Sequence, residues 1–195
     1  MKKGKLIGIY GINNTGKSTQ AKLLVERLKK DGKEAEYLKY PIYDLEPSGP
    51  LINEYLRNRN PHNFSVLEIQ LIYVLNRTQY EPIVKEKLES GINIIAEDYS
   101  GTGIAWGIGG GMDYNFAVNM NSHLLKEDLV FLLDGERFME SKESGHRHEE
   151  DHELTNRVRE VHKELGKEFG WLTINANDTI ENIHKIIHGK VKLSL

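Results

Sequence analysis

The sequence predicts an α/β fold in which a parallel β-sheet is covered by helices on both faces. Short apolar runs alternate along the chain with segments of helical periodicity, which is typical of such a sheet. Two of these runs, Ile92 to Glu97 and Leu129 to Asp134, are apolar without alternation, as expected for interior strands. Both end in a carboxylate, and ligands bind at the carboxyl edge of parallel sheets. We therefore expect the functional site at that edge.

The amino-terminal elements are defined by their apolar patterns and by glycine. Lys5 to Tyr10 is expected to form a buried first strand. In the next segment, Lys17 to Asp31, apolar residues fall at positions i, i+3, i+4 and i+7, which predicts a helix that stops at Gly32. A second strand is expected at Glu34 to Tyr40, and a short helix at Leu51 to Arg59 behind a proline-rich loop.

The longest expected helix runs from Ser65 to Ser90. Ser65 and Glu68 form a capping-box pattern at its start, and Gly91 stops it. Its apolar residues lie nearly all round, so we expect the central buried helix of the fold, with a candidate kink at Pro82.

The carboxyl-terminal third continues the alternation. Gly101 to Gly111 is rich in glycine, and its last part, Gly107 to Gly111, is expected to be a flexible connector. Asp113 to Leu125 is weakly helical in pattern. The remaining expected elements are a helix with Leu154, Val158, Val161 and Leu165 on one face, a strand at Trp171 to Asn175, and a last helix capped at Thr179.

The composition restricts the classes of function. A length of 195 residues corresponds to one α/β domain, expected to span residues 1–195. The net charge of −3 provides no global positive field for a nucleic acid polymer, so anion binding requires a local site. With 0 Cys there is no disulfide, thiolate zinc site or cysteine nucleophile. No apolar run approaches the roughly 20 residues that span a bilayer, so we expect a soluble, cytoplasmic protein without a membrane partner.

A phosphate-binding loop follows the first expected strand. Residues 11–18 match the pattern G-x-x-x-x-G-K-[ST] in full, directly before the first helix. In such a loop the backbone N–H groups and the positive end of the helix surround nucleotide phosphates, which indicates a P-loop NTPase fold. Lys17 is expected to neutralise the terminal phosphates, and the Ser18 hydroxyl to ligate Mg²⁺. The expected nucleotide-binding residues are Gly11, Asn13, Asn14, Thr15, Gly16, Lys17, Ser18 and Thr19.

Further motifs are spread over nearly the whole chain. Tyr40-Pro41 stands where an F-P-x-R loop is found in a known family of kinases. Glu68 to Tyr73, with Asn76-Arg77, resembles the acceptor-site helix of that family. The run Glu97 to Trp106 is similar to its D-R-Y-x-x-S-G-x-A-[FY] pattern.

The carboxyl-terminal motifs point to the same family. Gly145 to Glu149 lies where that family has a mobile lid, and Gly170 to Asn175 resembles its last strand and adenine loop. Together these motifs resemble thymidylate kinases, the P-loop kinases that make dTDP from dTMP and ATP. The resemblance implies a parallel five-stranded sheet with helices on both faces, a lid at about 137–151, the use of ATP and Mg²⁺, and a homodimer.

The resemblance also implies roles for individual residues. Arg77 would grip the acceptor phosphate or the base edge, Tyr73 would stack on the base, and Arg147 would reach the transferred phosphoryl group. The implied acceptor-binding residues are Tyr40, Leu56, Tyr73, Arg77, Glu97, Asp98, Thr102 and Trp106. The implied catalytic residues are Lys17, Glu97 and Arg147, and the implied metal ligands are Ser18 and Glu97.

Three positions depart from the family pattern, and each faces the acceptor. Asn13 replaces a loop carboxylate, Tyr43 replaces the arginine of F-P-x-R, and Asp98 replaces the arginine of D-R-Y. Two cations are therefore missing, and a charge-assisted hydrogen bond to a phosphate contributes roughly 1.5 to 3 kcal/mol. The ATP half of the site is accordingly better supported by the sequence than the acceptor half.

Two other functions fit these departures. In a nucleoside kinase the missing arginines would reflect an acceptor without phosphate, and Glu97 or Asp98 would act as general base. In a non-catalytic ATP-binding module the P-loop would be intact beside an incomplete acceptor site.

The histidines are not expected to bind metal. His146, His148 and His152 belong to a polar, acidic segment. His184 and His188, at i and i+4 on the last helix, have no evident third ligand and are expected to be solvated.

Overall fold

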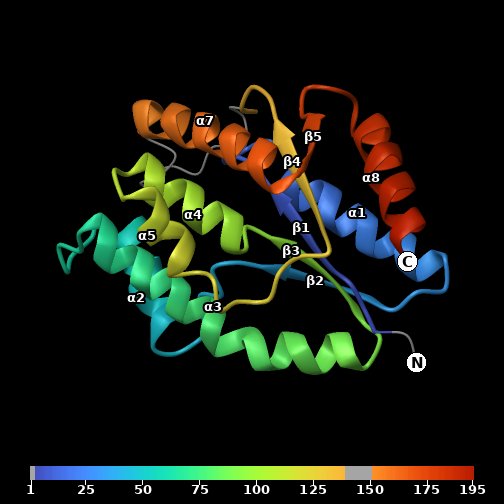
Figure 1. Ribbon diagram of the computed structural model, residues 1–195, viewed down its shortest axis with the longest axis horizontal. Coiled ribbons are helices and arrows are strands. Elements are labelled where there is room, and N and C mark those ends of the chain that lie inside the picture. The colour runs from blue at the N-terminus through green and yellow to red at the C-terminus, as the bar shows by residue number, and fades with distance from the viewer. Residues whose placement is uncertain (1–2, 139–150) are drawn as a thin grey trace.

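A computed structural model describes residues 3–138 and 151–195, and its core is a five-stranded parallel sheet (Figure 1). The strand order is β2-β3-β1-β4-β5, and every neighbouring pair is parallel. The strands are β1 (Leu6–Tyr10), β2 (Ala35–Lys39), β3 (Asn93–Glu97), β4 (Leu129–Asp134) and β5 (Leu172–Asn175). The predicted strands are thus all present, with ends that differ by no more than one residue.

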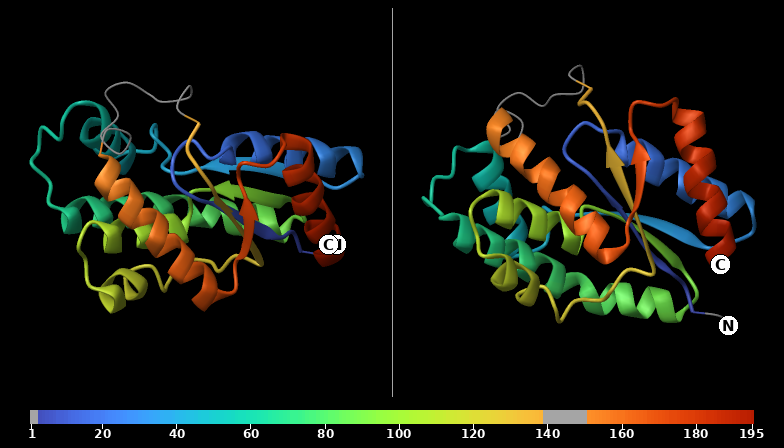
Figure 2. Two further views of the ribbon diagram at one scale, coloured as in Figure 1. Left: turned by 90° about the horizontal axis from the view of Figure 1, so that it is seen from above. Right: turned by 45° about the horizontal axis from the view of Figure 1, so that its top comes forward.

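Helices α1 (Lys17–Lys30) and α8 (Ile180–Ser194) cover one face of the sheet (Figure 2). Alternate strand residues such as Ile7 and Phe131 point to this face, where they pack against Leu24 of α1. The capping expected at the last helix is confirmed, because the Thr179 side chain accepts a hydrogen bond from the Asn182 N–H.

Helices α3 (Val66–Glu89), α4 (Ser100–Gly109) and α7 (His152–Phe169) cover the opposite face. The intervening strand residues, such as Leu6 and Leu132, pack here. Because both faces of β1, β3 and β4 are covered, these strands carry apolar residues at successive positions, which explains their lack of alternation.

The shorter helices pack on the outside of this second layer. Helix α2 (Ser48–Arg57) buries Ile52 and Leu56 against Ile69 of α3. Helix α5 (Tyr114–Asn119) is the only regular part of the segment that was weakly helical in pattern, and it is capped by the Asp113 side chain. The capping box of α3 is confirmed, since Ser65 and Glu68 bond reciprocally.

The prediction of a flexible connector at Gly107 to Gly111 is wrong for its first part, because α4 continues to Gly109. The glycines allow α4 to approach its neighbours closely. A Cβ atom on Gly101 would lie 2.5 Å from the Tyr10 ring, and one on Gly109 would lie 2.5 Å from Val158 of α7. Tertiary packing therefore offsets the low helix propensity of glycine, about 1 kcal/mol per residue relative to alanine.

The prediction that α3 is buried all round is also wrong. Leu67, Leu71 and Leu75 are 43%, 48% and 41% exposed and lie on one face of the helix at i, i+4 and i+8. This face lies on the outside of the second helix layer, and we call Leu67, Leu71 and Leu75 the α3 apolar face.

The histidines of α8 are half-buried rather than solvated. His188 Nε2 lies 2.7 Å from an oxygen of Asp31 at the end of α1, and the His184 ring stacks on the His188 ring. This contact joins the carboxyl-terminal half of α8 to α1.

Nearly all of the expected lid, with Arg147, His146 and His148, lies outside the described residues. Within residues 3–138 and 151–195, none of the helices combines the length and the apolar composition needed to span a bilayer.

A buried histidine makes the packing of α7 sensitive to pH. His162 is 1% exposed, and its Nδ1 lies 2.9 Å from the Val158 carbonyl oxygen. Burial lowers the pKa of His162 to about 4 from the ordinary 6.5. The unfolded chain therefore binds this proton at a higher pH than the folded chain, and stability falls as the pH drops from about 6.5 towards 4.

We expect the His162→Gln variant to lose less stability than the wild type when the pH is lowered from 7 to 4.5. The difference corresponds to about 2 to 3 kcal/mol, because roughly two pH units of this interval lie below the unfolded pKa of 6.5 and each contributes about 1.36 kcal/mol. Urea unfolding at both pH values measures it. The control is His152→Gln on the exposed start of the same helix, which should keep the wild-type pH dependence. An unchanged pH dependence in His162→Gln would contradict the assignment.

Candidate functional site

The carboxyl edge of the sheet opens into one cavity of about 740 Å³. One part of its wall is the loop after β1, the start of α1 and the segment from Ala176 to Ile183. The other part comes from the loop after β2 and from helices α2, α3 and α4. A single cavity thus joins a phosphate-binding loop to an aromatic and basic pocket.

The phosphate-binding loop has the backbone conformation that its glycines allow. Gly11 has φ 140°, and a Cβ atom there would lie 2.4 Å from the Leu133 carbonyl oxygen. Gly16 is left-handed at φ 85° and precedes α1, and none of the described side chains caps this helix. The first N–H groups of α1 therefore remain available to an anion, at the positive end of the helix dipole.

Lys17 lies folded against this loop. Its ammonium group donates to the carbonyl oxygens of Gly11 at 2.9 Å and of Ile12 at 2.8 Å. The side chain is 5% exposed, so it is held close to where the phosphates of a nucleotide would lie.

Glu97, the last residue of β3, is the centre of a buried polar network. Its carboxylate accepts hydrogen bonds from Ser18 Oγ at 2.8 Å and from the Tyr37 hydroxyl at 2.5 Å. The Lys39 ammonium lies 3.1 Å from it. Burial acts to raise the pKa of Glu97, but the charges of Lys17 and Lys39 and these hydrogen bonds outweigh burial and hold the pKa below its ordinary value.

Asp98 follows Glu97 in a left-handed conformation, with φ 60°. An oxygen of its carboxylate lies 3.6 Å from the Lys17 ammonium, and Thr102 donates a hydrogen bond to it at 3.1 Å. Burial, together with repulsion from Glu97, raises the pKa of Asp98 to about 6 against the opposing charge of Lys17. Asp98 is still largely ionised at neutral pH, so the acceptor side carries a carboxylate where the resemblance implies a cation.

Arg77 is a buried cation on α3. It is 2% exposed and donates to Asn121 Oδ1 at 2.9 Å, whereas its Nε has no hydrogen-bond partner within residues 3–138 and 151–195. Among the described residues, no carboxylate forms an ion pair with it. Burial lowers the pKa of Arg77 to about 10, a measure of the cost of leaving this charge without an anion. The site is therefore built to receive an anionic or strongly hydrogen-bonding group.

Apolar and aromatic side chains complete the acceptor half. Leu56 of α2, Tyr73 of α3 and Trp106 of α4 line the cavity together with Tyr40. Asn76 of α3 bonds the Ile42 backbone in both directions, at 2.8 and 2.9 Å, and so ties the loop after β2 to α3.

The predicted site residues come together in this cavity. Of those in the described part of the chain, every one lines it except Gly11, which lies behind Lys17. Arg147 lies outside the described residues. The carboxylate of Asp134, at the end of β4, does not line the cavity and pairs instead with Arg159 of α7 at 2.5 Å.

Two cations of the cavity wall, Lys39 and Arg57, are not among the site residues expected from the sequence. Lys39 is the last residue of β2. Its position at the carboxyl end of an expected strand could have indicated that it lies at the site. Arg57 is the last residue of α2, and nothing in the local sequence indicates that this helix end faces the site. Arg57 lies with its guanidinium carbon 4.7 Å from the centroid of the Tyr43 ring.

A family model, related sequences and a solved structure all identify thymidylate kinases as the proteins to which this chain is similar. A family model for thymidylate kinase matches residues 9–187. The chain is 32% identical over 189 residues to a thymidylate kinase of Plasmodium falciparum, with 95% of this chain and 89% of that protein covered. It is 29% identical over 194 residues to a thymidylate kinase of Homo sapiens, at the same coverage. A solved thymidylate kinase structure from Candida albicans matches with a TM-score of 0.80 and 25% identity, over 98% of this chain and 92% of that one.

Removing the charge of Arg77 should not destabilise the ligand-free protein as a core truncation does. We expect Arg77→Met to unfold within about 1 kcal/mol of the wild type or to be more stable, since replacing a buried charge by an apolar group of similar size relieves its desolvation. Urea unfolding of the ligand-free protein measures this. The control is Val84→Ala in the same helix, which should lose about 2 kcal/mol or more. A comparable loss in Arg77→Met would show that the guanidinium is structural.

Proposed function

The chain belongs to the thymidylate kinase family, and we propose that it uses the single cavity at the carboxyl edge to transfer a phosphoryl group from ATP to dTMP, giving dTDP. The observation that carries this proposal is the continuity of the cavity. A phosphate-binding loop and an acceptor pocket with a buried arginine, which pairs with no carboxylate of the described residues, open into the same space. Direct transfer between two bound nucleotides requires such an arrangement, because the reacting groups must be held in line and close together.

The donor half fits the phosphates of ATP. Backbone N–H groups of residues 11–16 and the uncapped start of α1 offer hydrogen bonds, and Lys17 supplies a positive charge. The Lys17 bonds to the Gly11 and Ile12 carbonyl oxygens are replaceable by bonds to phosphate oxygens. The segment from Ala176 to Ile183, next to the start of α1, is placed to receive the adenine.

The residues beside this loop also fit Mg²⁺. The Ser18 hydroxyl and the Glu97 carboxylate are oxygen donors 2.8 Å apart, and the pKa of Glu97 is held low, so the carboxylate is ionised. Ser18 would hold the ion directly, and Glu97 directly or through water. When bound, the ion neutralises charge on the ATP phosphates.

The acceptor half needs alignment and charge neutralisation more than a general base. The phosphate of dTMP is already an anionic nucleophile, so no proton has to be removed before attack. Arg77 is placed to bind the acceptor phosphate or the base edge, and Tyr73 and Trp106 to contact the base. Arg147 remains a prediction for the transferred phosphoryl group.

A turnover assay separates this function from its alternatives. ADP formation is measured with ATP and Mg²⁺ over a panel of nucleoside monophosphates and of the corresponding nucleosides. We expect dTMP to give the highest kcat/KM. Activity with thymidine and none with dTMP would indicate a nucleoside kinase instead, and no turnover with any acceptor would indicate a non-catalytic ATP-binding module.

Lys17→Ala should abolish that turnover, with kcat lowered by about 100-fold or more through loss of charge stabilisation in the transition state. The matched control is Lys22→Ala, a substitution in the same helix at a residue that does not line the cavity. Retained activity in Lys17→Ala would place the chemistry elsewhere.

We also propose that the protein forms a homodimer through the α3 apolar face. Leu67, Leu71 and Leu75 form an exposed apolar row on an outer helix, and Figure 1 shows α3 along the lower edge of the molecule. Burying this row against its copy would remove apolar area from water, at about 25 cal/mol per Å².

The substitution Leu71→Glu should convert a dimer into a monomer, as measured by size-exclusion chromatography with light scattering. A charge in the middle of an apolar interface is left without a partner and strongly disfavours association. The control is Leu193→Glu on α8, where the residue is 86% exposed. A wild-type protein that is monomeric at micromolar concentration would rule the proposal out.

A further inference from the structure

The acceptor side of the cavity lacks two arginines, yet it is not short of cations. Tyr43 and Asp98 stand where the family resemblance implies arginine. Four Lys and Arg side chains of the described chain nevertheless line the cavity, namely Lys17, Lys39, Arg57 and Arg77. Lys17 belongs to the phosphate loop, and Arg77 is fixed deep in the pocket by Asn121. Lys39 has so far been described only beside Glu97, and Arg57 only beside Tyr43, so neither has yet been given a role towards the acceptor.

Arg57 lies against the first of the two substituted positions. Its guanidinium carbon is 4.7 Å from the centroid of the Tyr43 ring, within the range of a cation–π contact. Tyr43 follows the Ile42 backbone that Asn76 ties to α3, so this ring is held in place. Tyr43, which offers no positive charge to a phosphate, thus holds a cation against its ring.

The contact with Tyr43 does not use the N–H donors of the guanidinium. Stacking uses the face of the guanidinium, whereas its N–H donors point outward in its plane. Nη1 donates to Asn53 Oδ1 at 2.9 Å, one turn earlier in α2, which orients the group. Arg57 also lies within electrostatic reach of the cavity wall. Burial raises the pKa of Tyr73, and the charges of Arg77 and Arg57 both oppose that rise.

Lys39 lies next to the residue that precedes the second substituted position. In the sheet it is paired with Glu97, the residue before Asp98, and its ammonium is 3.1 Å from the Glu97 carboxylate. The Lys39 side chain is 48% exposed against 2% for Glu97. The lysine side chain therefore extends from the buried Glu97 to a part of the cavity wall that an anion can contact.

We infer that Lys39 and Arg57 bind the phosphate of the acceptor nucleotide in place of arginines at positions 98 and 43. This inference rests on the proposed function. Both cations lie on elements next to the substituted residues. The positive charge that is missing at positions 98 and 43 is therefore supplied from neighbouring positions. Lys39 offsets the negative charge of Asp98, which would repel a phosphate. Arg57 is positioned by its contact with the Tyr43 ring.

Binding of dTMP and of thymidine by isothermal titration calorimetry tests this inference, because the two ligands differ only in the phosphate. Arg57→Gln and Lys39→Gln should each weaken dTMP binding by about 10- to 100-fold, the effect of losing one charge-assisted hydrogen bond. Thymidine binding should change by less than about 3-fold, since its base and sugar contacts remain.

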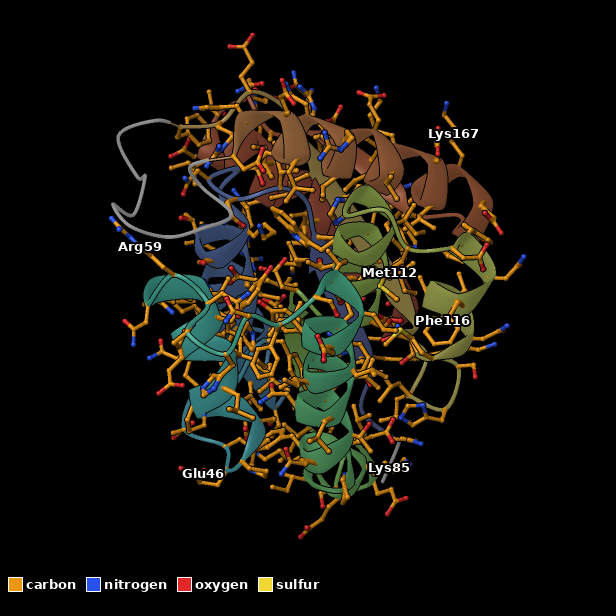
Figure 3. All side chains as sticks on the ribbon, turned by 90° about the vertical axis from the view of Figure 1, so that its left-hand side faces the viewer. Glu46, Arg59, Lys85, Met112, Phe116 and Lys167 are labelled. Atoms are coloured by element: carbon orange, nitrogen blue, oxygen red, sulfur yellow. The ribbon has the colours of Figure 1, made fainter. Side chains whose placement is uncertain are left out.

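The control is Arg59→Gln, which removes an arginine two residues after Arg57. Arg59 is exposed, does not line the cavity and lies at the outer edge of the loop after α2 (Figure 3). Its dTMP affinity should match that of the wild type. An equal loss of dTMP and thymidine affinity in Arg57→Gln would mean that the arginine only shapes the pocket. That result, or unchanged dTMP affinity in both variants, overturns the inference.

Moving the arginine from position 57 to position 43 tests whether either position can supply the cation that binds the phosphate. Adding Tyr43→Arg to the Arg57→Gln variant should restore most of the lost dTMP affinity, whereas adding Tyr43→Phe should not. Failure of the arginine to restore affinity contradicts this equivalence of the two positions. Turnover of dTMP by the wild type is measured on the same samples. If the wild type phosphorylates dTMP while the variants bind it normally, only this inference fails. If the wild type does not phosphorylate dTMP, the proposed function fails.

Discussion

The buried charges at the carboxyl edge of the sheet depend on one another, and the cavity is organised around their balance. Glu97 at the end of β3 is almost fully buried, and it stays ionised because Lys17, Lys39, Ser18 and Tyr37 surround it. Lys17 is in turn placed between the loop carbonyl oxygens and Asp98. A buried carboxylate without such partners would take up a proton, and a buried ammonium would lose one.

This balance is incomplete on the acceptor side, where Arg77 is buried and pairs with no carboxylate of the described chain. An uncompensated charge in the interior lowers stability, and it increases affinity for a ligand that supplies the opposite charge. The same group therefore weakens the empty protein and strengthens the complex. Asp98 has the opposite effect on an anionic acceptor, which makes the positions of Lys39 and Arg57 decisive for how the phosphate is held.

The close packing of α4 against its neighbours brings its backbone next to the buried Arg77. A Cβ atom on Gly103 would lie 2.6 Å from the Arg77 guanidinium, so glycine at this position lets the helix backbone approach the buried cation. Gly101 and Gly109 allow similar approaches to Tyr10 and Val158. Thr102, Gly103 and Trp106 of this glycine-rich helix line the cavity, and the helix continues to Gly109, into the stretch expected to be a connector. Local propensity argued against a helix there, and only contacts with distant residues made it one.

Much of the fold was predictable from the sequence, because burial of the strands on both faces leaves an apolar pattern without alternation. The capping box at Ser65 and the phosphate-binding loop were predictable for a similar reason, since each is a local arrangement in which the residues that interact are a few positions apart. Predicted acceptor residues such as Tyr40 and Trp106 also line the cavity, although they were identified by family resemblance and not by spacing.

The sequence by itself determined the parallel α/β fold, the phosphate-binding loop and the absence of two expected arginines. Only the tertiary structure decided which other cations face the cavity. Lys39 and Arg57 enter the site because β2 lies next to β3 and because α2 packs against α3. Such neighbours are distant along the chain, and their charges act through space at a few ångströms, which no local pattern of residues encodes.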